Sequence, residues 1–298
     1  MQTTAETTEK KLKIIVDKIH NLPTPPIVFT QITKVINNPD TSAYEIGGII
    51  AEDPALTAKV LKLTNSSFYG IPRTITNVKQ AIVILGLDAI KSLVISASVF
   101  DAFSKNKALD TEYLENFWRH SLSVAFMAKI ISRFRKTSNL QEAEIAFSGG
   151  LLHDIGKLIL ISHLPDEYLK IKALQEKESS MSEIDIESSV LQFNHAHLGS
   201  YMAGKWNLPE EICDAIMNHH SKKALPNGIL AAVIHLADYL AHKNELYDGK
   251  KIERKNPFYE SVWTTLGMDI SSTDQMLEML RSEYAKAETF LKMAQGMS

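Results

Sequence analysis

Seven histidine and aspartate side chains of this 298-residue chain could together bind metal ions. Imidazole nitrogens and carboxylate oxygens suit zinc, iron, manganese or nickel, and a bridging carboxylate allows two ions about 3.5–4 Å apart. Each of the seven lies within or at the edge of a segment with helical spacing. The set is His120, His153, Asp154, His195, His219, His220 and Asp238. It predicts a site for one or two transition-metal ions, with iron, zinc or manganese expected.

The segment 149–160, GGLLHDIGKLIL, holds the adjacent pair His153 and Asp154 in an otherwise apolar stretch. A carboxylate among leucines and isoleucines is costly to bury without a partner, which favours a metal-binding role for Asp154 over an ordinary core role. The paired glycines at 149–150 remove side chains one turn earlier, so another helix is expected to approach closely there. Gly156 is expected to end or bend the helix just beyond the pair.

The other five histidines have simpler interpretations, because a single histidine on a helix is usually a hydrogen-bonded core or surface residue. Three are expected to lie outside the site: His20, His163 and His242. Two are close in sequence to candidate ligands, and supporting or surface roles are expected for them: His197 and His235.

The elements that position these residues are predicted to be helices, because apolar residues recur at intervals of three and four and strand-like alternation never persists. Asp53 is expected to cap one helix with Pro54 in its first turn, and the pattern around Gly86 indicates one long helix or a broken pair. Later helices are expected at 112–134, about 140–155, about 165–176, 182–204, 209–219 and 227–242, followed by two more.

The predicted fold class is therefore all-α, in two units. Residues 1–20 form a polar lead and helix start, 21–106 an N-terminal helical module, and 107–298 a larger helical core with C-terminal helices. The boundary is placed in the polar stretch 101–112, because this stretch carries more charge than the sequence on either side.

Composition excludes several classes of protein. The formal net charge is -3, which provides no general field for nucleic acid or for an anionic membrane. The one cysteine, Cys213, cannot form an internal disulfide, and no signal-peptide pattern is present at the N-terminus. The most apolar stretch, 81–96, contains Asp88 and Lys91 and is shorter than the ~20 residues that span a bilayer. We therefore expect a cytoplasmic protein without a membrane span.

Four motifs occur in the order and approximate spacing of the HD superfamily: FWRHSLSVAFMAKII, GGLLHDIGKLIL, HAHLGSYMAGKWNLPEEICDAIMNHH and VIHLADYLA. The N-terminal module resembles a narrower family within this group. Its proline-rich start LPTPP, then DPAL, NSSFYG and the LG before the second long helix, resemble the HDOD family, an HD-related output domain of bacterial signalling proteins. Together the matches cover roughly residues 20–245. The resemblance implies an HD-like helical core.

The resemblance also implies roles for particular residues. The positions that match the four HD ligands are His120, His153, Asp154 and Asp238. The positions that match the additional ligands of HD-GYP phosphodiesterases are His195, His219 and His220. Lys157 matches the lysine that faces a substrate phosphate, although a lysine near a helix C-terminus is an equally good local interpretation. HDOD proteins are generally regarded as having lost some or all of these ligands, so their retention here departs from the family.

After the paired histidines, an HD-GYP enzyme should carry an acidic residue and a DGxGYP-like loop, whereas this chain has SKKALPNGIL. We therefore expect no useful hydrolysis of cyclic di-GMP, because the groups that would orient the dinucleotide are missing. Two functions follow. The favoured one is a regulatory output protein that binds a signalling partner and retains a metal site, and the alternative is a metal-dependent phosphohydrolase in which Lys157 neutralises developing charge.

The partner and the oligomeric state are open at this point. The input is expected from a separate molecule, from self-association or from the metal site itself. Phe29, Phe68 and Tyr69 suit a contact surface with aromatic anchors. They suit a plug between the two units at least as well.

Overall fold

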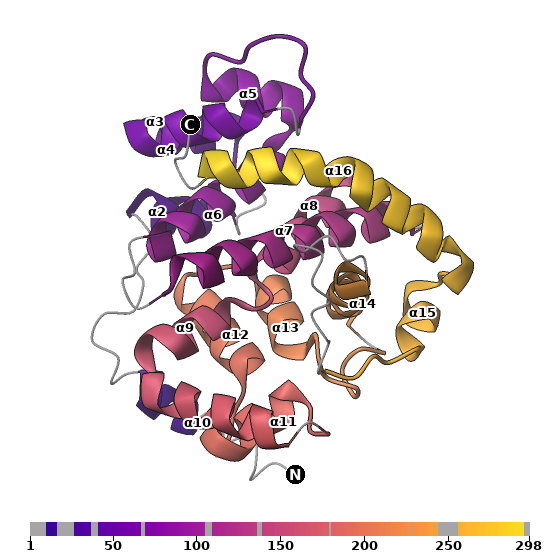
Figure 1. The fold of residues 1–298 in the computed structure, drawn as a ribbon. Coiled ribbons are helices and arrows are strands. Elements are labelled where there is room, and N and C mark those ends of the chain that lie inside the picture. The colour runs from indigo at the N-terminus through magenta and orange to yellow at the C-terminus, as the bar shows by residue number, and fades with distance from the viewer. Residues whose placement is uncertain are drawn as a thin grey trace.

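The computed structural model of the chain describes residues 10–16, 27–36, 41–66, 69–104, 109–135, 139–178, 180–226, 228–243 and 256–294. Within these ranges all regular structure is helical, which confirms the all-α prediction (Figure 1). The expected boundary at residue 106, His20 and Phe68 lie outside the described residues.

The N-terminal module is built from α2 (Ile27–Ile36), α3 (Ala43–Ala51), α4 (Pro54–Thr64), α5 (Val78–Leu85) and α6 (Leu87–Ser104). The Asp53 side chain accepts from the backbone N–H groups of Ala55 and Leu56, which confirms the predicted cap. Gly86 has φ +86° and separates α5 from α6, so the broken pair is the correct alternative. A short helix over 10–16 precedes these helices and packs elsewhere, since Lys11 donates to Gln192 of the second unit.

The second unit surrounds its long first helix, α7, which packs on α8, α14 and α16. Its helices are α7 (Thr111–Phe134), α8 (Leu140–Leu152), α9 (Ile155–His163), α10 (Pro165–Lys177), α11 (Glu183–Leu191), α12 (His195–Lys205), α13 (Glu210–Asn218), α14 (Ile229–Lys243), α15 (Ser261–Leu266) and α16 (Thr273–Ala294), with a 3₁₀ turn at Ile270–Ser272.

Three predictions about where helices end in this unit are wrong. The helix expected over 182–204 is interrupted, because Gln192 adopts φ 67° and Asn194 then caps α12 through the His197 N–H. The helix expected to reach residue 155 ends at Leu152, and α9 starts at Ile155. Gly156 lies inside α9, so it does not end the helix as predicted.

The two units meet along α6 and α8. Ser92 donates to the Glu144 carbonyl and accepts from the Ser148 hydroxyl, each at 3.0 Å. Small hydroxyl residues at this contact allow the helix backbones to approach closely. Phe29 is fully buried and Tyr69 is partly buried against the core, where burial and then Glu144 raise the pKa of its phenol. These contacts favour a core role for both aromatics.

The stretch Gln141–His163 is long and apolar enough to span a membrane by composition, but 78% of its most apolar window is buried inside the fold. It comprises most of α8, the turn at 153–154, and α9. The burial is what the core helix of a globular unit shows.

Candidate metal centre

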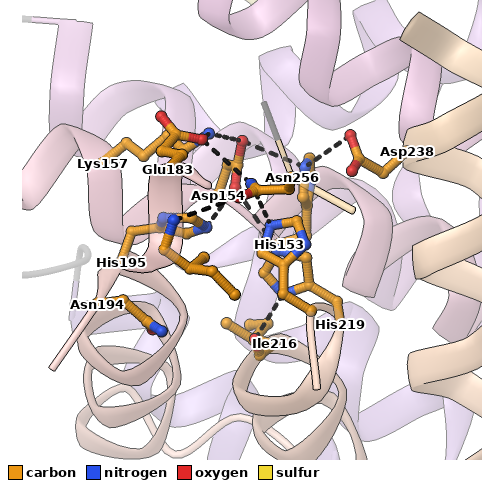
Figure 2. Close-up of polar contacts among 12 residues, drawn as sticks. His153, Asp154, Lys157, Glu183, Asn194, His195, Ile216, His219, Asp238 and Asn256 are labelled. Atoms are coloured by element: carbon orange, nitrogen blue, oxygen red, sulfur yellow. Dashed lines mark hydrogen bonds and ion pairs between the residues drawn. The ribbon is translucent and has the colours of Figure 1, made fainter. Parts of the chain in front are cut away.

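The structure brings all seven predicted ligands together from five helices and the turns beside them. His120 comes from α7, and His153 and Asp154 from the turn between α8 and α9. The remaining four come from the start of α12, the end of α13 and the middle of α14: His195, His219, His220 and Asp238. Figure 2 shows most of them converging from opposite sides on Asp154.

The ligand atoms form two groups within 4.8 Å of one another: Asp154, His195, His219 and His220 in one, and His120, His153 and Asp238 in the other. Asp154 lies between the groups. Its Oδ1 is 3.2 Å from His195 Nε2 and 3.7 Å from His219 Nε2. Its Oδ2 is 3.4 Å from His153 Nε2 and 3.8 Å from His120 Nε2. One carboxylate thus faces both groups, as a carboxylate shared by two ions does.

Glycines allow the helices to come this close. A Cβ on Gly150 would lie 2.8 Å from Ala125 Cα of α7, and one on Gly149 2.8 Å from Ile234 Cδ1 of α14, which confirms the expected close approach. A Cβ on Gly156 would lie 2.0 Å from the His195 carbonyl oxygen. The α9 backbone therefore rests directly on the first turn of α12, and this contact places His195 beside Asp154.

The first group contains polar atoms without hydrogen-bond partners among the described residues. They are Asp154 Oδ1, His195 Nε2, His219 Nε2 and His220 Nδ1. These side chains are almost completely buried, between 0 and 6% exposed. Asp154 Oδ1 and His195 Nε2 face each other at 3.2 Å as an ion pair, but polar atoms at such depth without a hydrogen bond are costly, and a cation coordinated by Asp154, His195 and His219 would remove that cost. The residues present therefore fit a metal ion.

Most of the candidate ligands whose pKa is shifted have the protonation state that metal binding needs: neutral for an imidazole and ionised for a carboxylate. Burial lowers the pKa of His120 and of His219 to about 4, so both imidazoles are neutral at pH 7. Burial alone would raise the pKa of Asp154, but His153 and Lys157 outweigh it and hold the pKa well below its usual range. Burial also opposes the charge of His195, yet Glu187 outweighs it and raises that pKa to about 10. A metal ion at His195 must therefore displace a proton.

Backbone carbonyls and one carboxylate orient three of the imidazoles. His153 Nδ1 lies 2.8 Å from the Gly150 carbonyl and His219 Nδ1 lies 2.7 Å from that of Ile216. His195 Nδ1 lies 2.8 Å from Glu187 Oε2. Such contacts place the proton on Nδ1 and direct Nε2 toward the centre, as the outer partners of metal-bound histidines do.

Sequence reasoning missed several residues around the centre. His242 was expected outside the site, and this is wrong: its Nδ1 is 3.0 Å from Asp238 Oδ1. Its position four residues after Asp238 on one helix was the available signal. Nothing local marked Glu183 and Glu187 of α11 or Asn256, whose contacts with the site are with residues eight or more positions away in the chain. His235 has the supporting role that was expected, with Nδ1 2.7 Å from the His219 carbonyl.

Lys157 lies beside the centre but has two carboxylate partners. Its Nζ is 2.8 Å from Asp154 Oδ2 and 2.9 Å from Glu183 Oε2 (Figure 2). Burial opposes the charge, but these carboxylates outweigh it and raise the pKa of Lys157 well above its ordinary value. The ammonium group is charged and already neutralised by its neighbours.

Known proteins resemble this chain over most of its length. The family model described as the HDOD domain matches residues 22–222. An uncharacterized protein of Treponema pallidum (strain Nichols) is 25% identical over 219 residues, 74% of this chain and 41% of that protein. Ribonuclease Y of Geobacter sulfurreducens is 31% identical over 131 residues, 44% of this chain and 19% of that enzyme. The chain thus spans less than half the length of these curated relatives.

In structure, an HDOD domain protein of Geobacter sulfurreducens with unknown function superposes with a TM-score of 0.76 at 24% identity, over 97% of this chain and 98% of that one.

Proposed function

We propose that this chain, which belongs to the HDOD domain family, is a bacterial signalling protein that acts through protein–protein contacts and holds one or two transition-metal ions in its core. The ions would be held by residues of the two ligand groups. Bound there, they would hold α7, α9, α12, α13 and α14 together. Their role in this proposal is structural or sensory.

One observation carries the preference for a protein without turnover. Lys157, the cation that a substrate phosphate would meet, is held between Asp154 and Glu183 at 2.8 and 2.9 Å. An incoming anion would have to compete with two carboxylates that already neutralise the ammonium group. A site arranged for phosphoryl chemistry directs its cations at the substrate.

The N-terminal module offers a surface for a partner. Tyr44 of α3 is 74% exposed and Val83 of α5 is 84% exposed. Lys79 connects them, since its Nζ lies 4.2 Å from the centre of the Tyr44 ring and it precedes Val83 by one helical turn. Exposed aromatic and apolar side chains beside a cation suit a protein contact.

A metal-dependent phosphohydrolase is the second candidate, and the position of Asp154 between the two ligand groups favours it. A pair of bound ions supplies Lewis acidity for phosphoester hydrolysis. In this alternative Lys157 would leave Glu183 and stabilise charge on the phosphoryl group. The relative named ribonuclease Y matches less than half of this chain, so its activity supports this candidate only in part.

Elemental analysis and turnover assays on the same preparation distinguish the two candidates. Protein purified without chelator is expected to carry about one or two equivalents of iron, zinc or manganese. Less than about a tenth of an equivalent would contradict the metal centre. Cyclic di-GMP, bis(p-nitrophenyl) phosphate and a short RNA should remain intact with each metal. Turnover of roughly 1 per second or more would establish the enzyme instead.

A pull-down tests the partner surface. Wild-type protein and a Tyr44→Ser/Val83→Ser variant would be used as baits in native lysate, with Ile270→Ser, another exposed apolar residue at 63%, as the control. The double variant is expected to lose a protein that wild type and control retain. If all three baits hold the same proteins, this face is not the contact surface.

A further inference from the structure

Asn256 closes one side of the candidate metal centre. It lies between α14 and α15 in the chain and is 8% exposed. Its Oδ1 accepts from the Ile184 N–H at 3.2 Å. Its Nδ2 lies 3.3 Å from Glu183 Oε2 and 3.2 Å from His220 Nε2. The amide therefore connects the first turn of α11 with a predicted metal ligand.

The two partners from α11 determine which way the amide points. A backbone N–H only donates, so the atom facing Ile184 must be the amide oxygen. The carboxylate of Glu183 accepts, because nearby Lys157 outweighs burial and lowers its pKa. The atom that faces His220 is thus the NH₂ group. Since an NH₂ group only donates, His220 Nε2 must accept and carries no proton.

This arrangement leaves His220 without a free nitrogen for a metal. An Nε2 that accepts a hydrogen bond carries no proton, so the ring is neutral. A neutral imidazole with an acceptor at Nε2 carries its proton on Nδ1. The lone pair of Nε2 is occupied by Asn256, and Nδ1, which has no partner among the described residues, has no lone pair to donate. His153 and His219 differ, because their partners lie at Nδ1 and leave Nε2 directed at the centre.

We infer that Asn256 keeps His220 out of the metal coordination, so that the first group binds its ion through Asp154, His195 and His219 until the Asn256 amide moves away. Asn256 is a positioning residue that competes with the metal for His220. The inference rests on the proposed metal centre. Coordination by His220, the fourth residue of the first group, then depends on the position of Asn256 just before α15.

Metal titration of chelator-treated protein with Zn²⁺ tests this competition. Asn256→Ala is expected to bind Zn²⁺ about tenfold more tightly than wild type, because ligation by His220 no longer breaks a buried hydrogen bond. A residue that merely supported the site would show the opposite sign, since loss of such a partner weakens metal binding 10–100-fold. Asn218→Ala is the matched control, because that amide donates to the Asp214 carbonyl and its loss should leave the affinity unchanged.

His220→Ala completes the cycle. In wild type it should change Zn²⁺ affinity less than about threefold, whereas in the Asn256→Ala background it should remove the tenfold gain. Weaker binding by Asn256→Ala, or a tenfold loss from His220→Ala alone, would overturn the inference. Far-UV circular dichroism verifies that each variant is folded.

Nitrogen-15 NMR of the histidine rings in metal-free protein gives a readout that needs no metal. The signal that disappears in His220→Gln should show the proton on Nδ1, and in Asn256→Ala this preference should be lost. A proton on Nε2 in wild type would overturn the inference even if the protein binds metal. If no variant binds Zn²⁺, the proposed metal centre fails, and the tautomer alone decides whether Asn256 holds His220 as inferred.

Discussion

At the scale of single residues, Asp154 has the most contacts that matter to the centre. Its two oxygens face different ligand groups, and its Oδ2 also pairs with Lys157. Buried at 3% exposure, an ionised carboxylate is tolerated only with such partners. Both groups therefore depend on this one side chain.

Replacement Asp154→Asn should remove metal from both groups, because an amide supplies neither the charge nor the second oxygen that a shared ligand needs. Elemental analysis is expected to find less than about a tenth of the wild-type content. Asp166→Asn, an exposed change on α10, is the control and should bind metal normally. Full occupancy in Asp154→Asn would show that the carboxylate is not a ligand.

The metal-free protein should lose stability in mild acid. The pKa values of His120 and His219 are about 4 in the folded chain and about 6.5 in an unfolded one, so between these values the unfolded chain binds more protons. The free energy of unfolding then falls as the pH falls, by about 2 kcal/mol per histidine between pH 6.5 and pH 5. His195, with a folded pKa of about 10, is protonated throughout this range while the unfolded histidine still gains protons as the pH falls, so it opposes the loss by less than about 1 kcal/mol.

Urea unfolding at pH 7 and pH 5 measures this slope. His219→Gln should reduce the difference between the two pH values by about 2 kcal/mol, because one of the histidines that gains its proton only on unfolding is gone. Equal stability of wild type at both pH values would refute the assigned protonation states.

The sequence predicted which residues could bind a metal better than it predicted which other residues would surround them. Histidine and aspartate types at helical spacing indicated seven ligand positions, and the structure places all seven in two adjoining groups; their binding of metal stays a prediction. Asn256 could not be predicted, because it reaches His220 from 36 residues further along the chain. An amide in a polar segment carries no sign of such a contact.

At the scale of elements, the crossing of α9 over α12 positions the centre. Gly156 makes the crossing possible, because a Cβ there would lie 2.0 Å from the His195 carbonyl oxygen and 2.8 Å from the Gly199 nitrogen. Both neighbours are backbone atoms, so neither can rotate away. The helices would have to separate, and His195 would move with α12.

Gly156→Ala should therefore destabilise the protein by several kcal/mol, in the range of severe overpacking, and lower its metal content. Gly204→Ala is the matched control: Gly204 also lies in a helix, α12, and a Cβ there meets nothing within 4 Å. By helix propensity alone, that change should be neutral or stabilising by up to about 1 kcal/mol. Urea unfolding compares the two. Equal stability of both variants would mean that the helices do not touch at Gly156.

Helix boundaries were predictable where a capping residue was followed by proline, and one was missed where the backbone turned without a glycine. Asp53 and Pro54 gave the start of α4 correctly. Gln192 takes the left-handed conformation that glycine or asparagine usually provides, so the apolar pattern ran across the break between α11 and α12. Asn194, a good capping residue, was the one signal of that break.

At the scale of the whole molecule, the two units share one continuous core. Buried residues of α4 and α6 belong to the same cluster as those of α7, α8 and α14. The last helix, α16, packs on α4 and α6 of the first unit and on α7 of the second (Figure 1). The two units expected from the sequence are therefore not packed as separate cores.

The protein should consequently unfold in one cooperative step. All three tryptophans, Trp118, Trp206 and Trp263, lie in the second unit, so their fluorescence reports that unit, whereas far-UV circular dichroism reports the helices of both. The two urea transitions are expected to coincide.

Leu280→Ala removes a fully buried side chain of α16 and should cost about 2–5 kcal/mol. Because α16 contacts both units, the variant should shift both transitions together. If the circular dichroism transition separated from that of fluorescence, the N-terminal helices would be an independent domain, and the predicted boundary near residue 106 would describe the molecule better than its shared core does.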